Sequence, residues 1–313
     1  MFELIKKLRA KGVIGMNFRN INLIGRYNPR NKYPLVDNKV ITKKIAKKVG
    51  IAVTELYATI EWQSQLKNLD KILAPYESFV IKPVHGSGGK GIVVVTHVED
   101  GLFIRANGTS MTISDIHNHI SNILSGLYSL GGRYDTAIIE KMVDFDPIFQ
   151  DYSYEGVPDI RLIVYKGYPI MAMMRCATHE SNGKANLHQG AVGVGIDIAT
   201  GKAINAVQHN RPVDIHPNTK HSFIDLKIPR WEEIMLIGAK CYEITGLGYL
   251  GVDIVFDKNV GPLLLELNAR PGLAIQIAND KGEYHRVMRV DQESPDHTPE
   301  ERVLFSRDIL SKI

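Results

Sequence analysis

The chain has 313 residues, with 38 lysines and arginines, 34 aspartates and glutamates, and a formal net charge of +4 at pH 7. This length can bury a sizeable core in two or three lobes of one unit, and the small charge, without basic runs interleaved with aromatics, indicates no nucleic-acid partner. A hydrophobic content of 44% without a long apolar run predicts no membrane span, and two cysteines without metal or disulfide spacing predict a cytoplasmic protein.

In chain order, the first predicted element is an amphipathic helix near residues 2–11. An irregular polar stretch follows at residues 17–34, which we expect to be ordered only by its contacts. Apolar residues at near-helical spacing predict a second helix over residues 38–49, with Gly50 as its stop. Two short β-rich runs, residues 79–83 and 91–95, then flank a glycine-rich loop.

The second half of the chain alternates further helices with apolar strands. The predicted elements are a helix at 113–130, strands at 136–143, 159–165 and 168–176, a glycine-rich segment to 201, a helix at 231–245, and paired strands at 249–256 and 262–269. Strands joined mostly by hairpins, with helices between groups of them, predict an α+β fold.

The glycine-rich loop lies in "FVIKPVHGSGGKGI", residues 79–92, where Gly86, Gly88 and Gly91 satisfy G-x-G-x-x-G. A dinucleotide site or a Walker loop would need a helix directly after the glycines, and here a β-branched run follows. The loop therefore predicts a hairpin whose backbone N–H groups approach the phosphates of a nucleotide, with Lys82 directing a cation at them. The alternative is an ordinary glycine turn on a surface hairpin.

A second constellation lies in "GVDIVFDKNVGPLLLELNARPG". Glu266 and Asn268 are two residues apart on a predicted strand, so both side chains leave one face while Leu265 and Leu267 enter the core. If "DKNVG" is a hairpin turn, Asp253 on the partner strand converges with them. These hard oxygen ligands suit Mg²⁺ held with nucleotide phosphates, whereas the alternative is a strand with its polar face in water.

Together the two constellations resemble the ATP-grasp superfamily over about residues 37–280, which implies two α+β lobes whose antiparallel sheets grip ATP. The motifs "DIRLIV", "GKANLHQGAVG", "GVDIV" and "LELNARPG" are similar to those of the ribosomal-protein glutamate ligases and alpha-L-glutamate ligase-like proteins. The phrase "KPVHGSGGKG" also resembles the sugar-transfer associated ATP-grasp proteins.

The resemblance implies a role for each matching position. The phosphates would be bound by Lys82, by Lys39 with Lys43 as its rival, and by the loop residues Gly86, Ser87, Gly88, Gly89, Lys90 and Gly91. The adenine would be bound by Glu140 and by the backbone around Lys141 and Met142, the ribose by Asp159, and the terminal phosphate by Lys184 and Asn186. Mg²⁺, with Mn²⁺ as an alternative, would be bound by Asp253, Glu266 and Asn268.

The same resemblance assigns the catalytic cations, which are Arg161, Arg175, Lys184 and Arg270. Lys184 stands where the glutamate ligases have arginine, so its charge is kept without the bidentate fork. Arg270 stands where they have a small residue. His188, next to this segment, is expected to cap the loop rather than to orient substrate.

The expected activity is an ATP- and Mg²⁺-dependent carboxylate–amine ligase that works through an acyl phosphate and adds an amino acid, such as glutamate, to a peptide or small molecule. One alternative is a cell-envelope or polysaccharide enzyme with a sugar-linked acceptor, and another is a non-catalytic ATP-binding regulator. The expected domains are residues 1–36, a core of 37–280 with lobes at about 75–138 and 139–280, and a tail of 281–313. Because few residues precede the core, we expect a truncated region before it, completed by a partner subunit or a homo-oligomer. We also expect a lid within residues 97–135.

Overall fold

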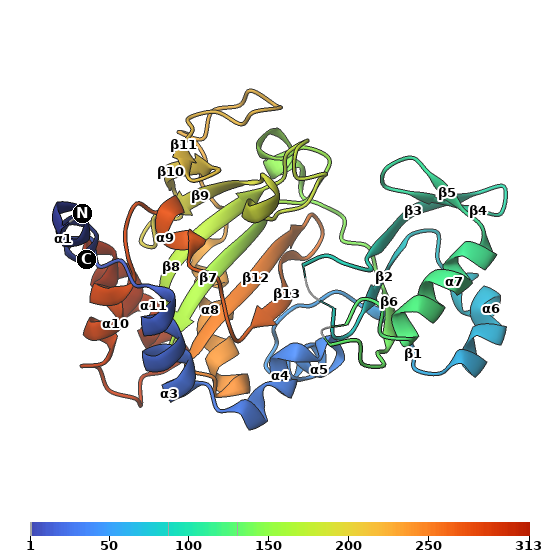
Figure 1. Ribbon diagram of the computed structural model, residues 1–313, viewed down its shortest axis with the longest axis horizontal. Helices are drawn as coiled ribbons and strands as arrows, with labels where there is room; N and C mark the ends of the chain where they lie inside the picture. The colour runs from blue at the N-terminus through green and yellow to red at the C-terminus, as the bar shows by residue number, and fades with distance from the viewer. Residues whose placement is uncertain (1, 87, 130) are drawn as a thin grey trace. The chain divides into compact units, whose positions relative to one another are not determined.

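The computed structural model describes residues 2–86, 88–129 and 131–313, which form two compact units. Unit 1 comprises residues 1–36, 44–52 and 145–313, and unit 2 comprises residues 37–43 and 53–144. The helices α4 (Pro34–Asp37) and α5 (Lys39–Lys48) each span a point where the chain passes from one unit to the other. Figure 1 labels the elements of both units.

Unit 2 is built on a six-stranded antiparallel sheet in the order β1-β6-β2-β3-β4-β5. Its strands are β1 (Leu56–Ile60), β2 (Phe79–Pro83), β3 (Val93–Glu99), β4 (Leu102–Arg105), β5 (Ser110–Met111) and β6 (Ala137–Glu140). Its helices are η3 (Gln63–Asn68), α6 (Leu69–Leu73) and α7 (Ile113–Leu124). The apolar side of α7 packs with the sheet through fully buried isoleucines, Ile116, Ile120 and Ile123.

Unit 1 is built on a seven-stranded antiparallel sheet in the order β11-β10-β9-β8-β7-β12-β13. Its strands are β7 (Asp159–Tyr165), β8 (Tyr168–Cys176), β9 (Val192–Ile196), β10 (Ala203–Gln208), β11 (Arg211–Pro212), β12 (Tyr249–Asp257) and β13 (Gly261–Asn268). Residues of β7 and β12 are buried along their whole length, which explains why these strands read as nearly continuous apolar runs.

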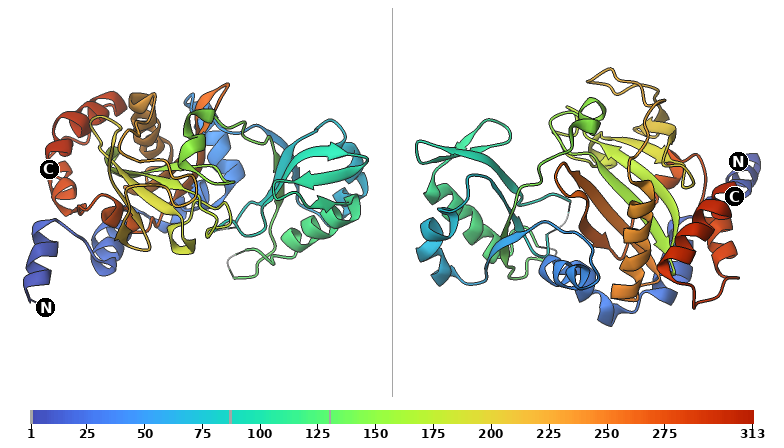
Figure 2. Two further views of the ribbon diagram at one scale, coloured as in Figure 1. Left: turned by 90° about the horizontal axis from the view of Figure 1, so that it is seen from above. Right: turned by 180° about the vertical axis from the view of Figure 1, so that it is seen from behind.

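The helices of unit 1 come from both ends of the chain and from its middle. They are α1 (Phe2–Ala10), α2 (Met16–Phe18), the π-helix η1 (Arg19–Ile24), α3 (Gly25–Tyr27), η2 (Arg30–Lys32), η4 (Pro147–Tyr152), η5 (Leu187–Gln189), α8 (Trp231–Thr245), α9 (Ala274–Ala278), α10 (Tyr284–Val290), α11 (Pro299–Asp308) and η6 (Leu310–Lys312). The long helix α8 crosses the sheet face that is turned to the viewer in the right panel of Figure 2. Among the described residues, no helix is both long and apolar enough to cross a membrane.

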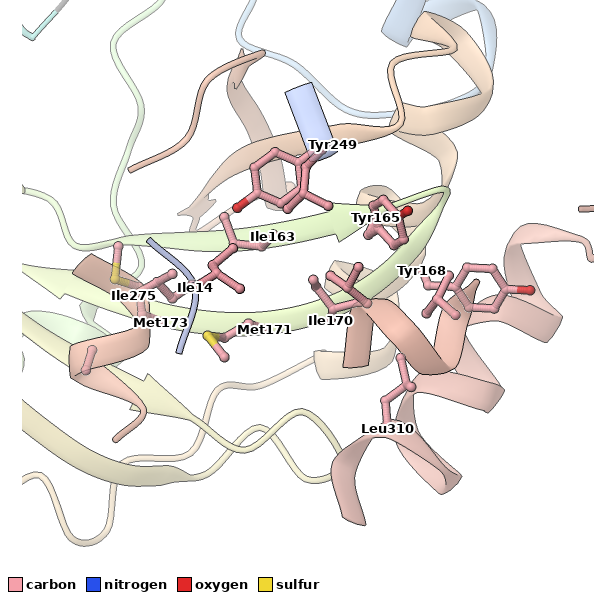
Figure 3. Packing of buried hydrophobic residues seen from close by; sticks show 14 of the residues in the cluster. Ile14, Ile163, Tyr165, Tyr168, Ile170, Met171, Met173, Tyr249, Ile275 and Leu310 are labelled. Carbon is pink, nitrogen blue, oxygen red and sulfur yellow. The ribbon is translucent and has the colours of Figure 1, made fainter. Parts of the chain in front are cut away.

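A buried cluster of unit 1 joins the first and last segments of the chain to the sheet (Figure 3). Ile14 from the N-terminal segment and Leu310 from the C-terminal tail belong to the same cluster as Ile163 and Tyr165 of β7. Both the N-terminal segment and the C-terminal tail thus belong to unit 1.

The stretch at residues 17–34 is helical rather than irregular, and its order comes from tertiary contacts. Leu23 is 1% exposed in the core. The buried Asn28 side chain donates to the carbonyl oxygens of Tyr249 and Ala269 at 2.7 and 2.9 Å and accepts from the Tyr249 N–H. Because these partners lie more than 200 residues away, local periodicity carries no signal of this structure.

The glycine-rich segment up to residue 201 contains the strand β9, which the sequence did not predict. A side chain at Gly195 would place its Cβ 2.3 Å from the carbonyl oxygen of Ala278. The glycine is needed because the backbone at the end of α9 lies directly against the strand.

Candidate functional site

Unit 2 carries a buried cluster of three charged side chains at the start of the glycine-rich loop. Glu140, at the end of β6, forms ion pairs with Lys82 of β2 and with Lys43 of α5, the second at 2.9 Å. All three side chains are less than a tenth exposed. Burial favours the neutral form of Glu140, but Lys82 and then Lys43 lower its pKa below the usual value. We call these three residues the lysine–glutamate trio.

The trio follows from strand register, because Lys82 lies opposite Ile138 on β6, two residues from Glu140. Glu140, which the resemblance assigns to adenine, holds two lysines through its carboxylate. Lys43, the rival for the second phosphate lysine, also donates to the Thr54 carbonyl oxygen at 3.0 Å. The trio contains two ammonium groups and one carboxylate, so it carries one more positive than negative charge.

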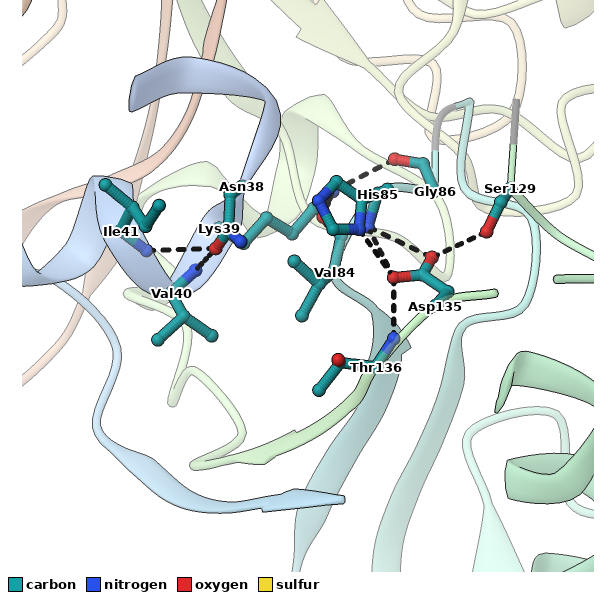
Figure 4. A network of polar contacts seen from close by, with 10 residues as sticks. All are labelled: Asn38, Lys39, Val40, Ile41, Val84, His85, Gly86, Ser129, Asp135 and Thr136. Carbon is teal, nitrogen blue, oxygen red and sulfur yellow. Dashed lines mark hydrogen bonds and ion pairs between the residues drawn. The ribbon is translucent and has the colours of Figure 1, made fainter. Parts of the chain in front are cut away.

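Lys39 lies at the other side of the loop base. Figure 4 shows its side chain reaching the carbonyl oxygens of Val84 and Gly86, at 3.1 and 2.9 Å. Two lysines of one helix, Lys39 and Lys43, thus approach β2 and the loop that follows it.

The glycine-rich loop itself lies between β2 and β3, so a strand follows it as expected. Gly88, Gly89 and Gly91 have φ of 64°, 73° and 74°, which is the region that favours glycine. A Cβ at Gly91 would also lie 2.6 Å from the Tyr128 ring. Lys90 is exposed, and Ser87 lies outside the described residues.

The loop base is anchored by Asp135 and His85, which the sequence interpretation missed (Figure 4). The carboxylate of Asp135, 6% exposed, accepts from the N–H groups of His85 and Thr136 and from the Ser129 hydroxyl. It also lies 2.8 Å from Nδ1 of His85. The only sequence signal was the position of His85 directly before Gly86, since Asp135 is 50 residues away.

Unit 1 carries the second buried cluster, on the neighbouring strands β8, β7 and β12. Arg161 donates through Nε and Nη2 to both carboxylate oxygens of Asp253, and Arg175 does the same to Asp159. Nη2 of Arg175 also lies 3.0 Å from Oδ2 of Asp253. Register places Arg161 opposite Asp253 and Asp159 opposite Arg175. These four residues form what we call the arginine–aspartate quartet, which has no net charge.

The two carboxyl groups of the quartet differ in pKa. Burial raises the pKa of Asp159 to about 6, with Arg175 opposing and the charge of Asp253 adding to the shift. Burial also opposes ionisation of Asp253, but Arg161 and then Arg175 lower its pKa to about 2. Below about pH 6, Asp253 therefore carries the charge of the pair, and Asp159 is the residue that takes up a proton near pH 6.

The predicted hairpin is confirmed, and it brings Glu266 opposite Asp253 and Asn268 opposite Gly251. A β-bulge at Leu265 makes this pairing, because Leu264 pairs with Ile254 and the next ladder pair is Glu266 with Asp253. Leu267 is 5% exposed, as expected, whereas the bulged Leu265 is only half-buried. Oδ1 of Asn268 accepts from the Arg270 N–H at 2.8 Å.

The predicted metal ligands are Asp253, Glu266 and Asn268. Within the described ranges, no three His, Cys, Asp or Glu side chains gather into a metal centre by themselves. The donor set of Asp253, Glu266 and the Asn268 amide fits Mg²⁺ in type, because all three present hard oxygens. Both Asp253 oxygens are held by arginines, so Glu266 and Asn268, which are half-buried, are the more accessible ligands.

The remaining predicted residues belong to neither cluster. Lys184 is exposed, and Asn186 accepts through its side chain from the His188 N–H at 3.0 Å, so Asn186 rather than His188 caps the short helix η5. The Lys141 N–H donates to the Glu55 carbonyl oxygen, and Met142 is half-buried beyond it. The guanidinium of Arg270 lies 5.2 Å from the centre of the Tyr33 ring.

Comparison with known proteins decides the family. Residues 18–292 match the family described as sugar-transfer associated ATP-grasp. The chain belongs to this family. The two antiparallel sheets agree with the ATP-grasp fold, and the match confirms the superfamily expected from the two constellations.

Solved structures give distant matches to the sugar-transfer associated ATP-grasp chain. The ATP-grasp ligase PsnB complexed with minimal precursor is 12% identical, with a TM-score of 0.45, over 85% of this chain and 63% of that one. The D-alanine–D-alanine ligase from Coxiella burnetii is 12% identical, with a TM-score of 0.44, over 90% of this chain and 60% of that one. This chain thus spans less than two-thirds of either, and comparison with curated proteins gave no match.

Proposed function

We propose that this sugar-transfer associated ATP-grasp protein is an ATP- and Mg²⁺-dependent ligase that joins a carboxylate to an amine. The observation that carries the proposal is the charge of the trio in unit 2. Two buried lysines share one carboxylate beside a glycine-rich loop, which suits the binding of a polyphosphate. Lys82 and Lys43 are assigned to the phosphates, with Lys39 supporting the loop.

Unit 1 supplies the groups for metal and for charge that develops on the transferred phosphoryl group. Asp253, Glu266 and Asn268 would hold Mg²⁺, which when bound neutralises phosphate charge. Arg161 and Arg175 are cations held in fixed positions by Asp253 and Asp159, so they need little reorganisation to stabilise an anionic transition state. Lys184 and Arg270 are assigned to the same charge from more exposed positions.

The proposed reaction has two steps. A substrate carboxylate oxygen attacks the γ-phosphorus of ATP, which breaks the bond to the β,γ-bridging oxygen and gives an acyl phosphate and ADP. An amine then attacks the acyl carbon, loses a proton and expels inorganic phosphate, which leaves an amide. Because the reaction is driven by positioning and charge, no Ser–His or Cys–His arrangement is required.

The substrates are the finer part of the proposal. An amino acid such as glutamate is the first candidate for addition to a peptide or small molecule. A sugar-linked acceptor is the second candidate, and the description of the matched family favours it. In either case we expect the adenine to lie at Glu140, Lys141 and Met142 and the ribose at Asp159.

The test is release of ADP and phosphate from Mg-ATP by the purified full chain, against amino acids, short peptides and amino sugars, singly and in pairs. Release that requires a carboxylate and an amine together supports the ligase. The variant Glu266→Ala should lower turnover by at least about 100-fold while the fold is kept. Tight ATP binding with no turnover across the panel would favour a non-catalytic regulator, and normal activity of Glu266→Ala would overturn the metal assignment.

A further inference from the structure

A polar pocket lies in unit 1, and none of its lining residues is assigned to ATP or metal. It has a volume of about 450 Å³, which is within the range of small-molecule sites in proteins. The end of β9, the strand β10, the segment after α9 and the helix α10 contribute to its lining. Its two cations are Lys281 and Arg286.

Arg286 is 7% exposed, and its hydrogen bonds with the described residues leave most of its guanidinium unused. Nη1 donates to the carbonyl oxygen of Ile170 at 2.6 Å, whereas the buried Nε has no partner in the described part of the chain. A buried guanidinium is costly to desolvate, and one neutral carbonyl does not balance its charge. The Nε–Nη2 edge has the spacing that matches two oxygens of a carboxylate or phosphate group.

Lys281 adds a second positive charge to the same pocket. Its ammonium makes no hydrogen bond or ion pair with any residue in the described ranges. Burial lowers the pKa of Lys281, the neighbouring charge of Arg286 lowers it further, and the charge of Asp197 opposes both. An oxyanion bound in this pocket would offset the repulsion between the two cations.

Two carboxylates, Asp197 and Asp280, also line the pocket. The charge of Asp197 attracts both Lys281 and Arg286, but it forms no ion pair with either among the described residues. Asp197 accepts from the N–H groups of Ala199 and Thr200 within its own turn, and Asp280 is paired with Lys11 at 2.6 Å. Burial raises the pKa of Glu283 to about 7, so its charge at neutral pH is partial.

We propose that this pocket binds a small molecule through an oxyanion, either a phosphate or a carboxylate group, held between Lys281 and the Nε–Nη2 edge of Arg286. The site is distinct from the phosphate-binding lysines of unit 2, because none of its lining residues belongs to that unit. The ligand would be a phosphorylated or multiply carboxylated small molecule, and the two classes are separated by experiment.

The test is calorimetric titration of the nucleotide-free full chain with inorganic phosphate and, separately, with malonate, at constant ionic strength. We expect saturable binding of one probe in preference to the other, and this identifies the class. Lys281→Ala should weaken that binding about tenfold, because a hydrogen bond to a charged group is lost. Arg286→Lys, which keeps the charge and loses the fork, should weaken it as well.

Two controls make the result decisive. Lys240→Ala removes a half-buried lysine of α8, outside the pocket, and should leave binding unchanged. Lys82→Ala removes a lysine assigned to ATP, so it should weaken only phosphate binding in unit 2 and leave the binding event of the pocket unchanged. The Lys281 side chain makes no hydrogen bond or ion pair within the described ranges, so its variant remains informative if Arg286→Lys fails to fold. No saturable binding, or binding lost in Lys82→Ala but kept in Lys281→Ala, would overturn the proposal.

Discussion

The two buried charge clusters of this protein differ in their balance. The lysine–glutamate trio of unit 2 has two cations for one carboxylate, whereas the arginine–aspartate quartet of unit 1 has two of each. Beyond the quartet, Glu266 adds a further carboxylate opposite Asp253. An unbalanced positive cluster is suited to bind an anion, and a balanced cluster next to an extra carboxylate is suited to hold cations in place and to accept a metal. The net charge of each cluster thus distinguishes a cluster suited to bind an anion from one suited to hold cations in place.

The largest expected effect would break the quartet. Asp253→Asn leaves Arg161 with a neutral partner in a buried place, and removing one member of such a pair costs about 3–5 kcal/mol of stability. Urea unfolding of the full chain measures this change. The matched variant Glu266→Gln, in a half-buried position, should change stability by less than about 1 kcal/mol. Equal stabilities for both variants would contradict a structural role for the quartet.

The pH dependence of stability should have opposite signs for Asp159 of the quartet and Glu140 of the trio. The pKa of Asp159 in the folded protein is about 6, above its unfolded value, so the folded state holds a proton that the unfolded state loses between about pH 4 and 6. Its contribution therefore falls by about 3 kcal/mol as pH rises through that window. Glu140 has a lowered pKa, so its contribution is present above about pH 4.5 and is lost as pH falls.

Urea unfolding at several pH values, with Asp159→Asn and Glu140→Gln as difference references, separates these two contributions. The stability advantage of the wild-type chain over Asp159→Asn should shrink toward pH 6, and its advantage over Glu140→Gln should shrink below pH 4.5. Parallel curves for wild type and Asp159→Asn between pH 4 and 6 would show that Asp159 titrates as an ordinary carboxylate.

A smaller effect is expected from reducing the positive charge of the trio. Lys43→Met should weaken ATP binding ten- to hundredfold, equivalent to about 1.4–3 kcal/mol, because a buried cation would no longer meet the phosphates. Lys39→Met should weaken it less, since Lys39 donates to the loop carbonyls of Val84 and Gly86. Equilibrium binding of a fluorescent ATP analogue checks both. A larger loss in Lys39→Met would restore Lys39 as the principal phosphate lysine.

The smallest effect is expected at Arg270, which is exposed and lies outside both clusters. Arg270→Ala removes the contact of the guanidinium with the Tyr33 ring. The activation free energy should rise by about 0.5–1 kcal/mol, which is a two- to fivefold loss of turnover. Arg270→Lys keeps the charge and should recover part of the loss. A hundredfold loss in Arg270→Ala, measured as ADP release, would make Arg270 a principal catalytic cation.

Much of the fold could be predicted because its strongest signals are local. The helix at 231–245 and the strands at 159–165 and 168–176 have the predicted bounds, since periodicity and apolar runs determine them. The predicted helix at 113–130 ends earlier, at Leu124, because Gly126 has φ of 85° and a side chain there would meet Arg133. The segment at 17–34 could not be predicted as helical because its partners are remote in sequence.

The candidate site shows the same division. Glu266, Asn268 and Asp253 were found because a two-residue spacing and a hairpin turn bring them together. The pairing of Glu140 with Lys82 and Lys43, and of Asp159 with Arg175, depends on cross-strand register and on side-chain direction, which no spacing within the chain encodes. Sequence therefore identified most of the charged residues of the clusters but not their partners.

The bulge at Leu265 also bears on the effect of deleting one residue from β13. If the ladder continued from the turn without a bulge, Leu265 rather than Glu266 would pair with Asp253. A chain that lacked Leu265 would still pair Glu266 with Asp253, because the bulge holds the one residue that the ladder does not count. Such a deletion would instead remove the bend and the added twist that a bulge introduces into its strand. The strand can thus lose a residue without exchanging the partners of its acidic groups, and what changes is the direction in which they point.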